Sequence, residues 1–253
     1  MGDTTTVTFY RDGFFGYSNT QDFFIGSVWH FIPITIAIII ILLIHRYRKK
    51  IRKSKYEETI RYIMAFIMLM AEMSYFWRLL YVGSQGNASD MSGYLPLQMC
   101  QWGLILCVFT LLSKSKKLFS ISFYITIGFA IIGVSYPMVI LNTGPTYYRY
   151  YQFWFEHLLP IISLFYLMFV HKLKPEYKGI YKTIIAILPL TFICVLVNNS
   201  IPDANYLYLK LKVPVLPDNQ IAKIPFLIII VIGLFNLLYF IFNKCLNRKK
   251  KKI

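Results

Sequence analysis

The sequence has few charged residues and very few acidic ones. Only 15% of its 253 residues are charged, and the 11 Asp and Glu residues face 27 Lys and Arg residues. Soluble domains carry about 25% charged residues, so this chain has too little charge to cover a water-facing surface. Hydrophobic residues make up 57% of it. These proportions exclude an ordinary soluble protein and indicate a membrane protein.

The chain also lacks the motifs of a disulfide-bonded or nucleic-acid-binding protein. Its four cysteines, Cys100, Cys107, Cys194 and Cys245, lie in or beside apolar segments without metal-type spacing. The net charge is +16, but no soluble segment carries a basic stripe interleaved with aromatic residues. Lys and Arg instead form short clusters beside apolar segments, where they set topology and attract anionic lipid. We therefore expect membrane phospholipids as partners, and no nucleic acid.

Several apolar segments approach the length of about 20 residues that a bilayer core of about 30 Å requires. The sequence predicts an all-α, polytopic membrane protein: a seven-transmembrane-helix bundle that forms one domain over residues 1–253. The apolar run after Trp29 precedes its basic cluster, so we expect a retained first helix and not a signal peptide. An outer N-terminal segment (1–26) and a basic cytoplasmic tail (244–253) flank the bundle. The predicted spans are 27–44, 60–82, 95–113, 118–141, 153–170, 183–199 and 224–243.

The loops alternate in charge along the chain. Basic residues crowd the segments 45–61, 114–117, 172–182 and 244–253, whereas the other side has few. The positive-inside rule places the crowded side in the cytoplasm and the N-terminus outside. We expect a multi-pass protein of the plasma membrane. The longest outer loop, 200–223, could be a lid over a cavity, although an ordinary interfacial connection is the favoured interpretation.

Polar residues inside spans are costly, so their positions carry functional information. A charged residue at a helix centre costs about 2.5–3.5 kcal/mol, and an intramembrane carboxylate such as Glu72 is a candidate functional group. Arg78 lies on a different face of the same helix. The other polar candidates lie near the outer ends of six helices, where we expect a site; Pro137 and Pro160 there either bend helices around a polar cavity or make packing kinks. These candidates are His30, Gln98, Cys100, Gln101, Tyr136, His157, Asn205 and Tyr206.

A thiol and two imidazoles at one depth predict a Cys–His pair, in which an imidazole takes the thiol proton and the thiolate attacks an ester. Two alternatives remain open. One is a zinc-dependent hydrolase with His30, His157 and Glu72 as ligands, although these residues are far apart in the sequence. The other is a non-enzymatic protein that binds a lipid or small molecule.

The segment Leu95-Pro96-Leu97-Gln98-Met99-Cys100 resembles the Leu-Pro-Leu-His-x-Cys motif of the YwaF-like family of bacterial integral membrane proteins. The entry to the first helix at His30 and the segments 152–157 and 204–206 complete the resemblance, which covers essentially the whole chain. That family is related to the eukaryotic acyltransferase transmembrane protein 164. One residue departs from its pattern, since Gln98 stands where the family usually has His.

The resemblance implies transfer of a fatty acyl chain between lipids through an acyl-cysteine, without a cofactor. Cys100 would be the nucleophile and His157 the base, with His30 as a competing base. We further expect Gln98 or Asn205 to stabilise the oxyanion and Glu72 to orient an imidazole. The predicted function is therefore a lipid acyltransferase or lipid-ester hydrolase of the outer leaflet.

Overall fold

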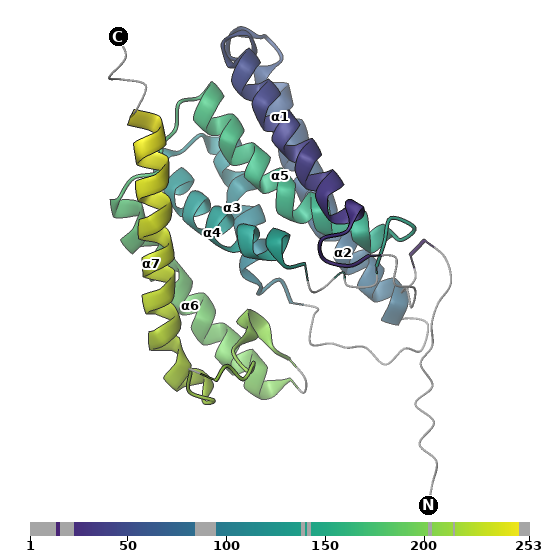
Figure 1. Cartoon of the computed structure of the whole chain (residues 1–253), viewed down its shortest axis with the longest axis vertical. Coiled ribbons are helices and arrows are strands. Elements are labelled where there is room, and N and C mark those ends of the chain that lie inside the picture. Colours follow the sequence, from purple (N-terminus) through teal and green to yellow (C-terminus); the bar gives the residue numbers. More distant parts are fainter. Residues whose placement is uncertain are drawn as a thin grey trace, which may run out of the picture.

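The computed structural model describes residues 14–15, 23–83, 95–137, 140, 143–201, 204–214 and 216–247, without the side chains of 79–83 and 244–247. Most of the predicted outer segment 1–26, and residues 248–253 of the predicted tail, lie outside this part. Within it, every regular element is a helix (Figure 1). The elements are α1 (Val28–Lys53), α2 (Glu57–Gly83), α3 (Met99–Ser113), α4 (Lys116–Ser135), α5 (Tyr148–Val170), α6 (Lys178–Ser200), the short 3₁₀-helix η3 (Tyr206–Tyr208) and α7 (Gln220–Asn247).

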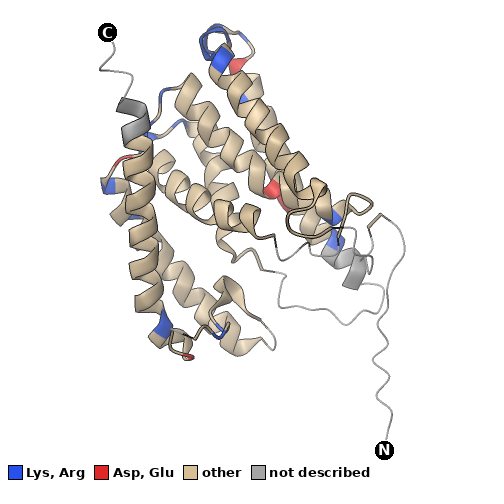
Figure 2. Ribbon diagram, viewed as in Figure 1, with Lys and Arg blue, Asp and Glu red and all other residues tan. Residues whose placement is uncertain are grey.

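Six of the described helices are long and apolar enough to cross a membrane. The exception is α3, because its 15 residues reach only about 22 Å, less than the bilayer core of about 30 Å. In Figure 2, Lys and Arg lie mainly at the ends of helices, and the long middle parts are almost free of charge. The prediction of an all-helical multi-pass membrane protein is thus confirmed, while a seventh crossing and the orientation of the termini stay predictions.

The ends of α1 and α4 differ most from the predicted spans. Helix α1 continues to Lys53, so much of the predicted first basic loop is helical; Lys and Arg are good helix formers, and positive charge stabilises a helix C-terminus. Helix α4 ends at Ser135, and Tyr136 leaves the helical region with φ −137° and ψ 73°. A proline disfavours the helical conformation at the residue before it. Pro137 therefore follows α4 and does not bend it.

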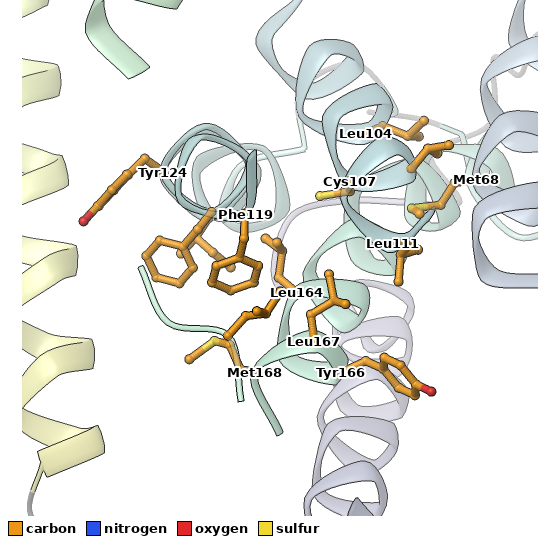
Figure 3. Close-up of a cluster of buried hydrophobic side chains, with 14 of the residues drawn as sticks. Met68, Leu104, Cys107, Leu111, Phe119, Tyr124, Leu164, Tyr166, Leu167 and Met168 are labelled. Atoms are coloured by element: carbon orange, nitrogen blue, oxygen red, sulfur yellow. The ribbon is translucent and has the colours of Figure 1, made fainter. Parts of the chain in front are cut away.

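The main hydrophobic core lies where α3, α4 and α5 pack together, with α2 against α3 and α5 (Figure 3). Phe119, Leu164 and Leu167 are fully buried there. Cys107 is also fully buried, with its Sγ atom 3.3 Å from Thr126 Oγ1. It is a small core residue.

A polar cluster joins helices at the end of the bundle where α1 connects to α2. Glu57 Oε1 accepts hydrogen bonds from Arg61 Nε at 3.0 Å and Tyr166 OH at 2.9 Å, and lies 2.6 Å from His171 Nε2. Arg61 is 1% exposed and also donates to the carbonyl of Leu111 at 2.6 Å. These bonds tie α2 to α3 and α5.

Helices α6 and α7 join the rest of the bundle chiefly through α4. In Figure 1 they lie on one side of α3 and α4, whereas α1, α2 and α5 lie on the other. The N-terminal half of α5 and helix α7 are therefore apart from each other. Each of them lines one side of the cavity described next.

Candidate active site

A cavity of about 710 Å³ lies between α3, α4, α5, α6, α7 and the η3 segment. Its volume falls within the range of about 300–1,000 Å³ that is usual for ligand pockets. The first turns of α3 and α5 line it, so it lies at the end of the bundle opposite the basic connection between α1 and α2. Six residues predicted from the sequence line it: Gln98, Cys100, Gln101, Tyr136, His157 and Tyr206.

Cys100 lies in the first turn of α3 and is half-buried. The helix begins here because Gln98 has an extended backbone and donates its own N–H to Gln101 Oε1 at 3.1 Å. The first N–H groups of a helix have no acceptor within it and carry partial positive charge.

His157 is held in one orientation on α5. Its Nδ1 atom lies 2.8 Å from the carbonyl oxygen of Phe153. A carbonyl only accepts hydrogen bonds, so Nδ1 carries the proton, and Nε2 of the neutral ring has a free lone pair. The ring stacks on Phe153 with centroids 4.1 Å apart. On α4 it faces Gly133, where an added Cβ would lie 3.1 Å from Nε2.

His30 makes a different set of contacts and is not among the residues that line the cavity. Its Nε2 atom lies 2.8 Å from the carbonyl oxygen of Val134, and its Nδ1 accepts a hydrogen bond from the N–H of Gly26 at 3.0 Å. Both ring nitrogens are therefore used by main-chain groups. His30 connects α1 to the end of α4.

Glu72 is buried on α2, and its Oε1 atom accepts a hydrogen bond from Gln101 Nε2 at 2.9 Å. Its Oε2 atom has no hydrogen-bond partner among the described residues. The expected contact between Glu72 and an imidazole is therefore replaced by a contact with Gln101, the residue next to Cys100. Arg78 is also buried on α2 but does not line the cavity.

Arg149 and Glu156 form a polar wall of the cavity, and Arg149 was not among the residues predicted for the site. Arg149 Nη1 lies 3.6 Å from Glu156 Oε2 and donates to Gln152 Oε1, and Gln152 Nε2 donates to Glu156 at 2.9 Å. The Arg149 guanidinium lies over the Tyr75 ring at 4.7 Å from its centroid. Residues 149, 152 and 156 share one helical face by their i+3 and i+4 spacing. This polar stripe on an otherwise apolar helix is the sequence pattern that could have predicted the polar wall.

The segment 206–211, here called the strap, lines another side of the cavity. Asn198 on α6 holds it through two bonds to the main chain of Tyr206, at 2.7 and 3.1 Å. Gln98 Oε1 accepts from the N–H of Leu207 at 3.2 Å, which connects the strap to the start of α3.

From α7, Lys223 is 2% exposed, and its Nζ donates to the strap carbonyls of Leu209 at 2.8 Å and Leu211 at 2.7 Å. Leu207 and Tyr208 have φ values of 57° and 53°, a left-handed conformation that costs bulky residues energy. Asn205, an expected oxyanion donor, does not line the cavity; its Oδ1 accepts from the N–H of Lys210 at 2.9 Å. The longest outer connection thus includes a wall of the cavity.

Within the described residues, no three His, Cys, Asp or Glu side chains are grouped as ligands for one metal ion. His30, His157 and Glu72 are therefore not brought together as the zinc alternative requires.

The helices and the cavity define a class: an all-helical, multi-pass membrane protein with a cysteine and a histidine in one cavity between its helices. The model of the TMEM164 family matches residues 24–243, and the chain belongs to this family. No curated protein and no solved structure matches the chain. The predicted relationship to transmembrane protein 164 is thus confirmed at the level of the family, while the narrower YwaF-like bacterial naming stays a prediction.

Proposed function

We propose that this protein is a membrane lipid acyltransferase, or a lipid-ester hydrolase, that works through Cys100 and His157. The observation that carries the proposal is that both residues line one cavity, with the Nε2 atom of His157 left free by the bond from Nδ1 to Phe153. Membership of the TMEM164 family supports a lipid substrate. His30 is not needed as a base, because both of its ring nitrogens are engaged.

In the first half-reaction, His157 Nε2 takes the proton of the Cys100 thiol, and the thiolate attacks the carbonyl carbon of a phospholipid ester. A carbon–sulfur bond forms and the carbonyl oxygen becomes an oxyanion. When this intermediate collapses, the bond from carbon to the lipid oxygen breaks. The leaving alkoxide takes the proton that His157 received from the thiol, and the acyl group remains on Cys100 as a thioester.

In the second half-reaction, the hydroxyl of an acceptor lipid gives its proton to His157 Nε2 and attacks the thioester. The carbon–sulfur bond breaks, and the Cys100 thiolate recovers the proton from His157. Water in place of the lipid hydroxyl gives hydrolysis. Gln98 lines the cavity, whereas Asn205 does not. The Oε1 atom of Gln98 accepts a hydrogen bond from the strap, and its Nε2 atom carries the N–H donors of the amide. Gln98 is therefore the proposed oxyanion donor in preference to Asn205.

The polar residues lie toward the predicted outer end of the bundle, so we place the reaction in the outer leaflet of the plasma membrane. The basic segment at the end of α1 and before α2 would then face the cytoplasm. This placement rests on the charge pattern of the loops.

The test is the intact mass of detergent-purified protein after incubation with mixed phospholipids. We expect a fatty-acyl increment that hydroxylamine removes, and its loss in Cys100→Ala. Cys107→Ala and Cys194→Ala are matched controls, because both thiols are buried and neither lines the cavity. Acyl transfer at full rate by Cys100→Ala would overturn the mechanism. Retention of lipid without turnover or an acyl increment would favour the lipid-binding alternative.

A further inference from the structure

The cavity has two unlike halves. Its polar residues come from α3, the outer part of α5 and the strap, whereas α6 and α7 contribute almost entirely apolar side chains. An amphiphilic ligand fits such a division, with its reacting group at the polar half and its hydrocarbon at the apolar half.

The apolar half is built from two matching stripes. Helix α6 contributes Ile184, Ile187, Leu188 and Thr191, and α7 contributes Ile224, Leu227, Ile228 and Val231. Both sets have the spacing i, i+3, i+4, i+7, which places their members on one face of a helix. Each stripe rises about 10 Å along its helix, so the two form a groove between α6 and α7.

Cys100 lies at one end of this groove. The residues that precede it, Leu97 and Met99, pack with Leu190 and Cys194 of α6, and Cys194 Sγ lies 3.6 Å from the carbonyl oxygen of Leu97. The Thr191 end of the α6 stripe is therefore near the thiol, and Ile184 lies at the far end.

A second cleft of about 150 Å³ continues the groove beyond Ile184. Its lining residues are Ile180, Tyr181, Ile184, Ile185, Ile232 and Asn236. Ile184 lines both spaces and packs against the main core. From Ile224 to Asn236 the combined path rises about 18 Å along α7, more than half of a bilayer core of about 30 Å.

We propose that the groove between α6 and α7 holds the acyl chain of the lipid substrate, and that Ile184 determines how long a chain fits. The inference rests on the proposed function for the identity of the reacting ester. Short chains end before Ile184, and long chains pass its side chain into the second cleft. Ile184 is thus a specificity-determining residue and not a catalytic one.

Two substitutions with opposite expected effects test this role. The protein is incubated with an equimolar mixture of dioctanoyl- and dioleoyl-phosphatidylcholine, and the ratio of oleoyl to octanoyl on Cys100 is measured by mass spectrometry. Ile184→Trp should lower this ratio at least about tenfold, since each methylene excluded from an apolar pocket is worth about 10-fold or more. Ile184→Ala should raise it. Ile193→Trp is the matched control, because Ile193 lies on α6, is 46% exposed and lines neither space. An unchanged ratio in both Ile184 variants would overturn the inference.

A binding measurement separates this inference from the proposed chemistry. Phosphatidylcholine with a photoreactive diazirine at the end of a long chain is bound to Cys100→Ala and irradiated, and the labelled peptides are mapped. We expect labels at residues 180–185 and 231–236 for the long chain, and at 187–191 and 224–228 for a short chain. Labels confined to lipid-facing residues such as Ile193 and Ile229 would overturn the groove. Labelling in the groove without any acyl-enzyme in the unmodified protein would overturn the proposed catalysis alone.

Discussion

The Nδ1 atom of His157 is 2.8 Å from the carbonyl oxygen of Phe153, one turn earlier on the same helix. This single bond determines which nitrogen of the ring can act as a base, because the carbonyl requires a proton on Nδ1. The two ring nitrogens of His30 are instead divided between an acceptor and a donor of the main chain. The two histidines of the predicted site therefore differ in what they can do.

Substitution of the two histidines should have different consequences. His157→Ala should lower the rate of acyl-enzyme formation about 10²- to 10⁴-fold, the usual worth of a general base. His30→Ala should leave the rate per folded molecule within a few-fold but lower the thermal midpoint. It removes the hydrogen bonds to the N–H of Gly26 and the carbonyl of Val134, and a typical hydrogen bond contributes about 0.5–1.5 kcal/mol. Rate and thermal unfolding are measured on the same preparations. A larger loss of rate in His30→Ala than in His157→Ala would contradict this assignment.

A methyl group at Gly133 should disturb the imidazole ring of His157 without weakening the helix. A Cβ there would lie 3.0 Å from His157 Cδ2 and 3.1 Å from Nε2, which is closer than normal contact, so the ring must shift. We expect Gly133→Ala to slow acyl-enzyme formation about tenfold or more. Gly233→Ala is the matched control, because nothing lies within 4 Å of its added Cβ; alanine should stabilise α7 there by about 0.5–1 kcal/mol. Equal rates for the two variants would show that the ring position does not matter.

Much of the fold could be predicted from the sequence, because apolar length and loop charge depend on local composition. The same pattern placed Cys100 and His157 at one level of the bundle. It could not tell which histidine lines the same cavity as the cysteine, since that depends on which helices are neighbours. The contacts of His30 with Val134 and of His157 with Gly133 come from the order of helices around α4.

The partners of the charged residues were harder to foresee. Glu72 was recognised as unusual, but its bond to Gln101 joins α2 to α3, and no spacing within α2 reveals it. Arg149 lies on α5 and lines the cavity, although the predicted span there begins only at residue 153. Its spacing from Gln152 and Glu156 could have placed it there. The stripes on α6 and α7 have the same spacing as any apolar helix face. They form a groove only because the two helices face each other, which their spacing does not reveal.

The polar cluster at the opposite end should matter for stability and not for chemistry. Glu57→Gln replaces a carboxylate whose partners are Arg61, Tyr166 and His171, and Arg61 is buried, with 2% side-chain exposure. The Glu57 side chain keeps 14% exposure, so we expect a loss of about 1.5–3 kcal/mol, the usual worth of a hydrogen bond to a charged group. The midpoint of thermal unfolding should therefore fall clearly. Glu58→Gln is the control, since the Glu58 side chain is 63% exposed and an exposed pair is worth about 0–1 kcal/mol. Similar midpoints for both variants would show that the Glu57 cluster contributes little.

Lys223 should determine how firmly the strap covers the cavity. Lys223→Met keeps the apolar stem but removes the two bonds from Nζ to the carbonyls of Leu209 and Leu211. Those bonds help to hold Leu207 and Tyr208 in their left-handed conformation, so their loss should let the strap open more often. Hydrogen exchange in detergent should become faster at residues 206–211, while exchange in α3 and α4 stays unchanged. Lys182→Met on α6 is the control, because Lys182 is exposed. If exchange of the strap is the same in both variants, Lys223 does not hold it closed.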